Sequence, residues 1–213
     1  LPDGSMLVST RFGDTAQLRR VRQPLGSREQ ITFDTEPITA ASAPQTGGAP
    51  GFVFLRDQGG NENAQIFYRD LTTRTTRRLT DGQSRNASAV WSRDGRRVAY
   101  TSTARDGVSY DLYIADVLEN AAPRFVMNGM SKTWFALDWS VDDSKLLVLN
   151  YRSINESYLF IADAITGSLT PVDAGNNRVG IRAARFAPDG RYIYLISDRD
   201  SEFARLRRVD TVL

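Results

Sequence analysis

The stretch WSRDGRRVAYTST at residues 91–103 decides the fold, because its pattern of residue types returns further along the chain. It recurs as WSVDDSKLLVLNY at 139–151 and as FAPDGRYIYLISD at 186–198, at spacings of 48 and 47 residues. The opening PDGSMLVSTR at 2–11 matches the last of these copies. One degenerate copy must lie between this opening and the copy at 91–103, and only residues 42–57 can hold it. A fixed period of this length is the sequence signature of a repeat architecture.

A second landmark gives the same period independently. Each copy carries a strand-like stretch downstream of the first landmark. The aligned aliphatic residues of these stretches lie 48, 46, 47 and 47 residues apart: Leu18, Ile66, Leu112, Leu159 and Leu206. Two landmarks that keep one period across five copies predict five structural repeats.

Within one copy, the pattern predicts four short antiparallel strands. The third copy contains the strand-like runs SAVWS, RRVAYTS, YDLYIADV and RFVMN, and no stretch keeps a helical period of 3.6 residues. Asp94-Gly95 between the first two runs indicates a tight hairpin with a primed turn, because glycine supplies the positive φ that such a turn needs. Asp143-Ser144 takes this place in the fourth copy, at some conformational cost.

Four-stranded units of this length define the blades of a β-propeller. We therefore predict an all-β fold, a partial β-propeller domain over 1–213 whose blades span approximately 1–34, 35–82, 83–129, 130–176 and 177–213. A small sheet cannot bury both of its faces alone, so neighbouring blades must stack. The aromatic residue that ends each first strand is expected to pack between blades rather than face a ligand: Trp91, Trp139 or Phe186.

Strand counting predicts that the propeller is incomplete at both ends. The first copy begins at its hairpin turn and lacks a first strand, and the last copy ends at Leu213 after its third strand. Both terminal copies keep their middle strands, so they do not complement each other into one blade. We expect part of a seven- or eight-bladed ring, with a five-bladed ring that lacks only those strands as the alternative. The start at Leu1, without Met or a signal-like segment, suggests a mature or trimmed product.

The composition excludes several kinds of chemistry within these residues. The chain contains no cysteine and no histidine. Disulfides, thiolate metal sites, thiol catalysis, a Ser-His-Asp triad and imidazole-ligated metals are therefore excluded, and we expect no cofactor and no metal site. The formal net charge of +2 argues against nucleic acid or a membrane surface as a partner. The recurrent Asp94, Asp142 and Asp189 fit tight turns better than a calcium loop.

The blade signature distinguishes between propeller families. The order aromatic-(Ser/Ala)-x-Asp-Gly-(Arg/Lys), followed by an aliphatic strand, resembles the TolB-like propeller repeat rather than the WD repeat, which carries a Gly-His pair. The same repeat builds the amino-terminal propeller of the prolyl oligopeptidase family of serine peptidases. The stretches at 60–62, 155–159 and 197–203 resemble segments of bacterial dipeptidyl- and acylaminoacyl-peptidase-like members of that family.

That resemblance implies a non-catalytic propeller, which gates access and helps bind short peptides for an α/β-hydrolase domain. The implied partners are that domain, the remaining blades and a peptide substrate. No Gly-x-Ser-x-Gly elbow lies in the chain, so no catalytic residue is expected here. The main alternative is a stand-alone TolB-like propeller that binds a protein. Catalysis through a central metal is poorly supported without histidine. Substrate preference and compartment, bacterial cytoplasm or periplasm, stay open.

Candidate binding residues lie in the loops between second and third strands, which all emerge on one face of a propeller. These loops hold Asp14, Asn61-Glu62, Arg105-Asp106, Asn155-Glu156 and Asp200-Ser201-Glu202. In dipeptidyl-peptidase relatives, propeller glutamates bind the free α-ammonium of the substrate, and that resemblance makes Glu156 and Glu202 the candidates. Arg152 or Arg199 is the candidate for a substrate carbonyl or carboxylate, with Asn155 beside them. The alternative is that these residues only solvate the loops or bridge blades.

Overall fold

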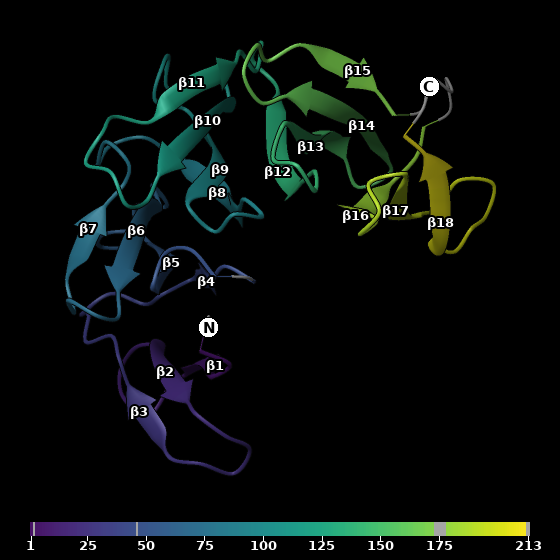
Figure 1. The fold of residues 1–213 in the computed structure, drawn as a ribbon. Coiled ribbons are helices and arrows are strands. Elements are labelled where there is room, and N and C mark those ends of the chain that lie inside the picture. The colour runs from purple at the N-terminus through teal and green to yellow at the C-terminus, as the bar shows by residue number, and fades with distance from the viewer. Residues whose placement is uncertain (2, 46, 173–177, 212–213) are drawn as a thin grey trace.

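The protein consists of small antiparallel sheets arranged around an open arc (Figure 1). The computed structural model describes residues 1, 3–45, 47–172 and 178–211. Within them, strands that are neighbours in sequence pair with each other to form five sheets, and no residue is helical. None of the described segments therefore has the length and hydrophobicity of a membrane-spanning helix. The predicted all-β propeller fold is confirmed.

The strands follow the repeat. Sheet 1 holds β1 (Met6–Thr10), β2 (Gln17–Val21) and β3 (Arg28–Gln30). Sheet 2 holds β4 (Ala40–Ser42), β5 (Gly51–Arg56), β6 (Gln65–Asp70) and β7 (Thr76–Arg78). Sheet 3 holds β8 (Asn86–Trp91), β9 (Arg97–Ser102), β10 (Asp111–Asp116) and β11 (Arg124–Met127). Sheet 4 holds β12 (Thr133–Trp139), β13 (Lys145–Ser153), β14 (Glu156–Asp163) and β15 (Leu169–Pro171). Sheet 5 holds β16 (Ile181–Phe186), β17 (Tyr192–Ser197) and β18 (Arg205–Asp210).

The first strands line the inner side of the arc, where β4 contacts β8, β8 contacts β12, and β12 contacts β16. Four hydrophobic clusters fill the four gaps between successive sheets. Strand β13 shows how one sheet supplies two of them, because side chains alternate between its faces. Leu146 and Val148 pack toward sheet 3, whereas Leu147 and Leu149 pack toward sheet 5. The uninterrupted apolar run in this strand therefore reflects burial on both faces.

The aromatic residue at the end of the first strand packs between sheets in sheets 3 to 5, as predicted. The Trp91 indole N–H donates to the Ser42 carbonyl at 3.0 Å, and the Trp139 indole N–H donates to the Val90 carbonyl at 3.0 Å. Each indole thus bonds to the first strand of the preceding sheet. Phe186 has no such donor, but its backbone N–H donates to the Asp138 carboxylate at 2.9 Å.

The hairpin at Asp94-Gly95 is wider than the predicted two-residue primed turn. Strand β8 ends at Trp91 and β9 begins at Arg97, and of the intervening residues only Gly95 has a positive φ, at 68°. The Gly95 N–H donates to the Ser92 carbonyl at 3.1 Å, and the Ser92 N–H donates to the Arg97 carbonyl at 2.8 Å. The glycine occupies the left-handed region, as predicted, but it closes a longer turn than the predicted tight primed hairpin.

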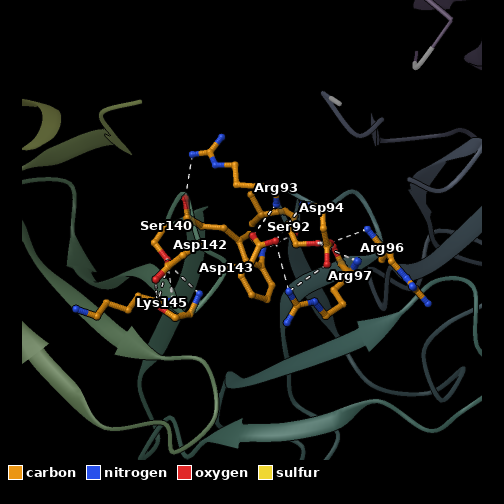
Figure 2. Close-up of polar contacts among 12 residues, drawn as sticks. Ser92, Arg93, Asp94, Arg96, Arg97, Ser140, Asp142, Asp143 and Lys145 are labelled. Atoms are coloured by element: carbon orange, nitrogen blue, oxygen red, sulfur yellow. Dashed lines mark hydrogen bonds and ion pairs between the residues drawn. The ribbon is translucent and has the colours of Figure 1, made fainter. Parts of the chain in front are cut away.

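The hairpins of sheets 3 and 4 are joined by a carboxylate (Figure 2). Asp143 has a φ of 56°, and its two oxygens accept from the backbone N–H groups of Arg93 at 2.6 Å and Asp94 at 3.0 Å. The Arg97 guanidinium lies 3.4 Å from the same carboxylate and stacks over the Trp139 ring. The cost of an aspartate in the left-handed region is therefore offset by bonds to the neighbouring sheet.

The two terminal sheets each have three strands and lie at opposite ends of the arc (Figure 1). In sheet 1, β1 occupies the inner edge that a first strand occupies in sheets 2 to 5. In sheet 5, β18 is the outer edge, where sheets 2 to 4 have a fourth strand. This is the incompleteness that strand counting predicts.

Candidate functional site

The antiparallel connectivity gives the arc two different ends. The hairpins between first and second strands lie at one end, which we call the hairpin face. The loops between second and third strands lie at the opposite end, together with the connections from one sheet to the next, and we call this end the loop face. All five predicted loops are on the loop face.

Glu156 is the first residue of β14, directly after the turn formed by Ile154 and Asn155. Its carboxylate accepts a hydrogen bond from the Tyr158 hydroxyl at 2.9 Å and lies 3.6 Å from the Arg178 guanidinium. The hydrogen bond to this carboxylate raises the pKa of Tyr158. Glu156 is thus oriented by a neutral donor, while Arg178, whose side chain is 84% exposed, can swing away from it.

Arg152 and Asn155 flank the same turn. Arg152 is an exposed residue of β13, and its Nε donates to the Asn150 side-chain oxygen at 2.9 Å. Asn155 lies exposed in the turn itself. The β13–β14 hairpin therefore places an arginine, an amide and a carboxylate within a few residues of one another at the loop face.

Glu202 and Arg199 lie in the loop between β17 and β18. Glu202 is exposed, and within the described chain its carboxylate makes no hydrogen bond or ion pair with another residue. Arg199 is half-buried, and its carbonyl accepts from the Arg207 guanidinium. Asp200 has a φ of 56° and lies 3.5 Å from Arg207.

The structure brings these two loops against each other at Gly180. Its N–H donates to the Asp198 carboxylate at 2.8 Å. A Cβ at Gly180 would lie 2.7 Å from the Ile154 carbonyl oxygen and 2.9 Å from the Asp198 carboxylate. Both distances are shorter than real Cβ atoms show, so glycine here lets the β13–β14 turn and the start of the β17–β18 loop adjoin. The described structure shows no direct bond between Glu156 and Glu202.

The remaining predicted loops are engaged in local structure. Asp111 is fully buried and accepts two bonds from Arg105, at 2.6 and 3.2 Å, and one from the Gly129 N–H at 2.7 Å. Hydrogen bonds from the Ser109 hydroxyl and backbone lower the pKa of Asp106 to about 2. These contacts make the β9–β10 loop a rigid unit, so Arg105 and Asp106 act structurally. Glu62 is paired loosely with Arg85 at 3.7 Å, and Asp14 is exposed.

The loop face also exposes large apolar side chains that the sequence analysis did not single out. Six of them, from all the sheets or the connections between them, are between 58% and 81% exposed: Phe12, Phe33, Val108, Met130, Ile154 and Phe203. These residues are spread along the sequence, and only the strand topology shows that they share one face.

No group of three or more carboxylates in the described part of the chain is arranged to hold a metal ion. The site therefore offers separate carboxylates, guanidinium groups and apolar side chains. Such a surface can bind charged and apolar groups.

Sequence comparison relates the chain to two kinds of protein. It is 31% identical over 179 residues to the Tol-Pal system protein TolB of Desulfosudis oleivorans, a match that covers 79% of this chain. It is 25% identical over 131 residues to dipeptidyl-peptidase 5 of Porphyromonas gingivalis, covering 53% of this chain. The matches span only 38% and 18% of those proteins. A scan against models of protein families finds no match.

Solved structures share the fold at low sequence identity. A prolyl endopeptidase structure superposes on 99% of this chain and 33% of its own, with a TM-score of 0.77 at 13% identity. Prolyl oligopeptidase B from Galerina marginata covers 100% of this chain and 34% of its own, with a TM-score of 0.74 at 13% identity. TolB from Acinetobacter baumannii covers 92% of this chain and 46% of its own, with a TM-score of 0.66 at 15% identity. The chain is thus an arc of a TolB-like β-propeller, the fold that TolB shares with the propellers of prolyl oligopeptidases.

Proposed function

We propose that this chain is the non-catalytic propeller part of a serine peptidase of the prolyl oligopeptidase family. In this role it gates access to an α/β-hydrolase domain and helps bind short peptides for it. The observation that carries the proposal is the fit to a prolyl endopeptidase, over 99% of the chain with a TM-score of 0.77, against 92% and 0.66 for TolB of Acinetobacter baumannii. The whole of residues 1–213 would act as one partial propeller domain.

The loop face supports this role by its chemistry. Its exposed phenylalanines, Phe12, Phe33 and Phe203, would be buried against the hydrolase domain, which stabilises the contact because apolar surface leaves water. A ring seated over the active site limits entry to peptides that pass it. The chain contributes access and orientation, and the partner domain contributes the chemistry of acyl transfer.

The candidate residues would bind the amino terminus of the peptide. A carboxylate binds an ammonium group well when the contact is charge-assisted and shielded from water. Glu156 is oriented by Tyr158, and Glu202 has its carboxylate uncommitted in the described structure. We propose these two as the ammonium-binding groups, with Arg152 or Arg199 for a carbonyl or carboxylate of the peptide and Asn155 beside them.

The second candidate function is a protein-binding propeller without enzymatic activity. It is favoured by the 31% identity to TolB over 79% of the chain, which exceeds the identity to the peptidase. In that case the loop face would bind a protein partner directly, through the same exposed apolar side chains.

The reading frame beyond Leu213 and a covalent probe separate these two functions. If the peptidase proposal holds, the gene encodes a Gly-x-Ser-x-Gly followed by Asp and His, and a fluorophosphonate labels a serine of the gene product outside residues 1–213. A stop codon after one or two further blades, together with no labelling, would instead establish the binding module and overturn the peptidase.

A further inference from the structure

A second binding site is indicated at the hairpin face, on the inner side of the arc. A hollow of about 200 Å³ lies there, and its lining comes from the ends of the first strands of sheets 2 to 5. Ser42 belongs to β4, Trp91 to β8, Asp138 to β12 and Arg185 to β16, and Arg93 follows β8 directly. The hollow therefore lies at the opposite end of the strands from Glu156 and Glu202.

The charge of this hollow is positive. Two arginines and one carboxylate line it: Arg93, Arg185 and Asp138. Asp138 is buried and already accepts from the Arg93 guanidinium at 2.8 Å and from the Phe186 backbone N–H at 2.9 Å. Its charge is thus neutralised by Arg93, which leaves the charge of Arg185 uncompensated within the hollow.

Arg185 is positioned to receive a ligand. Its side chain is exposed, and one nitrogen of its guanidinium donates to the Leu137 carbonyl, which orients the group along the neighbouring first strand. A guanidinium carries five donors, so further N–H groups remain for a second acceptor. Apart from Asp138, the described first strands carry no carboxylate that would compete for them.

Arg185 would bind an anionic group, and the other lining residues determine which part of a ligand can lie beside that group. Ala43, Ala89, Val90 and Trp91 also line the hollow and give it an apolar wall beside its cationic end. A planar guanidinium matches a carboxylate with two parallel hydrogen bonds, and the apolar wall accommodates a short hydrocarbon stem. We infer that this hollow binds a carboxylate on a short apolar stem, supplied either by a free dicarboxylic acid or by an acidic side chain or carboxyl terminus of a peptide.

Indole NMR signals of the full 213-residue chain test this site directly. The chain has three tryptophans, and Trp91 lines the hollow, whereas Trp134 bonds to the Gly129 carbonyl in the connection before β12 and serves as the internal reference. Succinate is titrated in one arm and a short Asp-containing peptide in the other, with the Asn peptide as its control. We expect a saturable shift of the Trp91 indole signal and no shift of Trp134.

Two variants separate a specific site from general charge. Arg185→Ala is expected to weaken binding by about tenfold or more, because the fork of donors is lost. Arg182→Ala removes the same charge from β16 outside the hollow and is expected to leave binding nearly unchanged. A shift with succinate alone identifies a free acid as the ligand, and a shift with the peptide identifies a protein segment. No saturable shift in either arm, a shift that survives Arg185→Ala, or equal displacement by inorganic phosphate overturns the inference.

Discussion

At the scale of single residues, Asp143 shows what sequence reasoning reaches and what it misses. Asp143, and not Ser144, has the positive φ of Gly95, at 56°. The sequence predicts only that Asp143-Ser144 takes this turn at some conformational cost. It does not show that both carboxylate oxygens bond to the hairpin of sheet 3, since those partners lie about one repeat away in the chain. The backbone strain lies at Asp143, whereas the hydrogen bonds that offset it come from the hairpin of sheet 3. Only the stacking of the two sheets brings these residues together.

Asp143→Gly tests this contact, because it relieves the turn while removing the bonds. We expect a net loss of about 1–2 kcal/mol in the free energy of unfolding, since three charge-assisted contacts outweigh the gain from a relaxed φ. Urea denaturation of the variant measures it. Asp189→Ala is the matched control, because Asp189 accepts from Arg191 within its own hairpin, and it should lose less. A glycine variant as stable as the parent chain would show that the contact contributes nothing.

The candidate site also makes a prediction at this scale. In the proposed full-length peptidase, Glu156→Gln and Glu202→Gln should each raise KM by about tenfold for peptides with a free amino terminus, which corresponds to the loss of one charged contact. The KM for the N-acetylated peptides should not change, and they serve as the control. Unchanged KM values for both variants with free peptides would remove these residues from the site.

Acid sensitivity follows from the turn aspartates. Bonds from Ser140 and Ser144 lower the pKa of Asp142 from 3.8 to about 2, and bonds from Ser109 do the same for Asp106. Because the folded state binds the proton more weakly than the unfolded state, this stabilisation is present above about pH 4 and is lost as the pH falls toward 2. The melting temperature should therefore fall over this range. Asp142→Asn should show a shallower fall, and an equally steep one would contradict the assignment.

At the scale of elements, the strands of a well-conserved repeat copy could be predicted from the sequence, whereas the short strand β4 of the degenerate copy could not. Strands β9 to β11 lie within the runs read from the third copy, because alternating apolar residues and a glycine turn mark them locally, and β8 overlaps its run but begins two residues earlier, at Asn86. Strand β4 has three residues and no aromatic end. The segment between β4 and β5 is positioned by contact with the β8–β9 hairpin of sheet 3, where the Ala49 N–H donates to the Gly95 carbonyl at 2.9 Å. Tertiary contact rather than local pattern defines this element.

The indole hydrogen bonds between neighbouring first strands lead to a prediction about how these strands are coupled. Trp139→Phe should destabilise the chain by about 1–3 kcal/mol, because the buried Val90 carbonyl loses its donor and the smaller ring leaves a gap. Amide hydrogen exchange should accelerate in both β8 and β12. Trp134→Phe is the control, since its indole bonds within the connection before β12, and it should leave the exchange of β8 unchanged. Equal effects of the two variants on β8 would argue against coupling through the indole.

At the scale of the whole molecule, the period of the repeat predicts the propeller, while the two proposed binding surfaces are not visible in the sequence. The exposed apolar residues of the loop face are scattered along the chain, from Phe12 to Phe203, and share a face only because every sheet has the same topology. The cationic hollow likewise combines residues from four sheets. Such sites depend on register and stacking, which no local pattern encodes.

The central claim is that successive small sheets are stacked radially and leave the two terminal sheets apart. Small-angle X-ray scattering of the 213-residue chain, recorded as it elutes from a size-exclusion column, measures this shape directly. The expected profile matches the curved, open arc of five sheets in Figure 1. A profile of a compact sphere, of a closed ring, or of sheets strung out without fixed mutual orientation would contradict it.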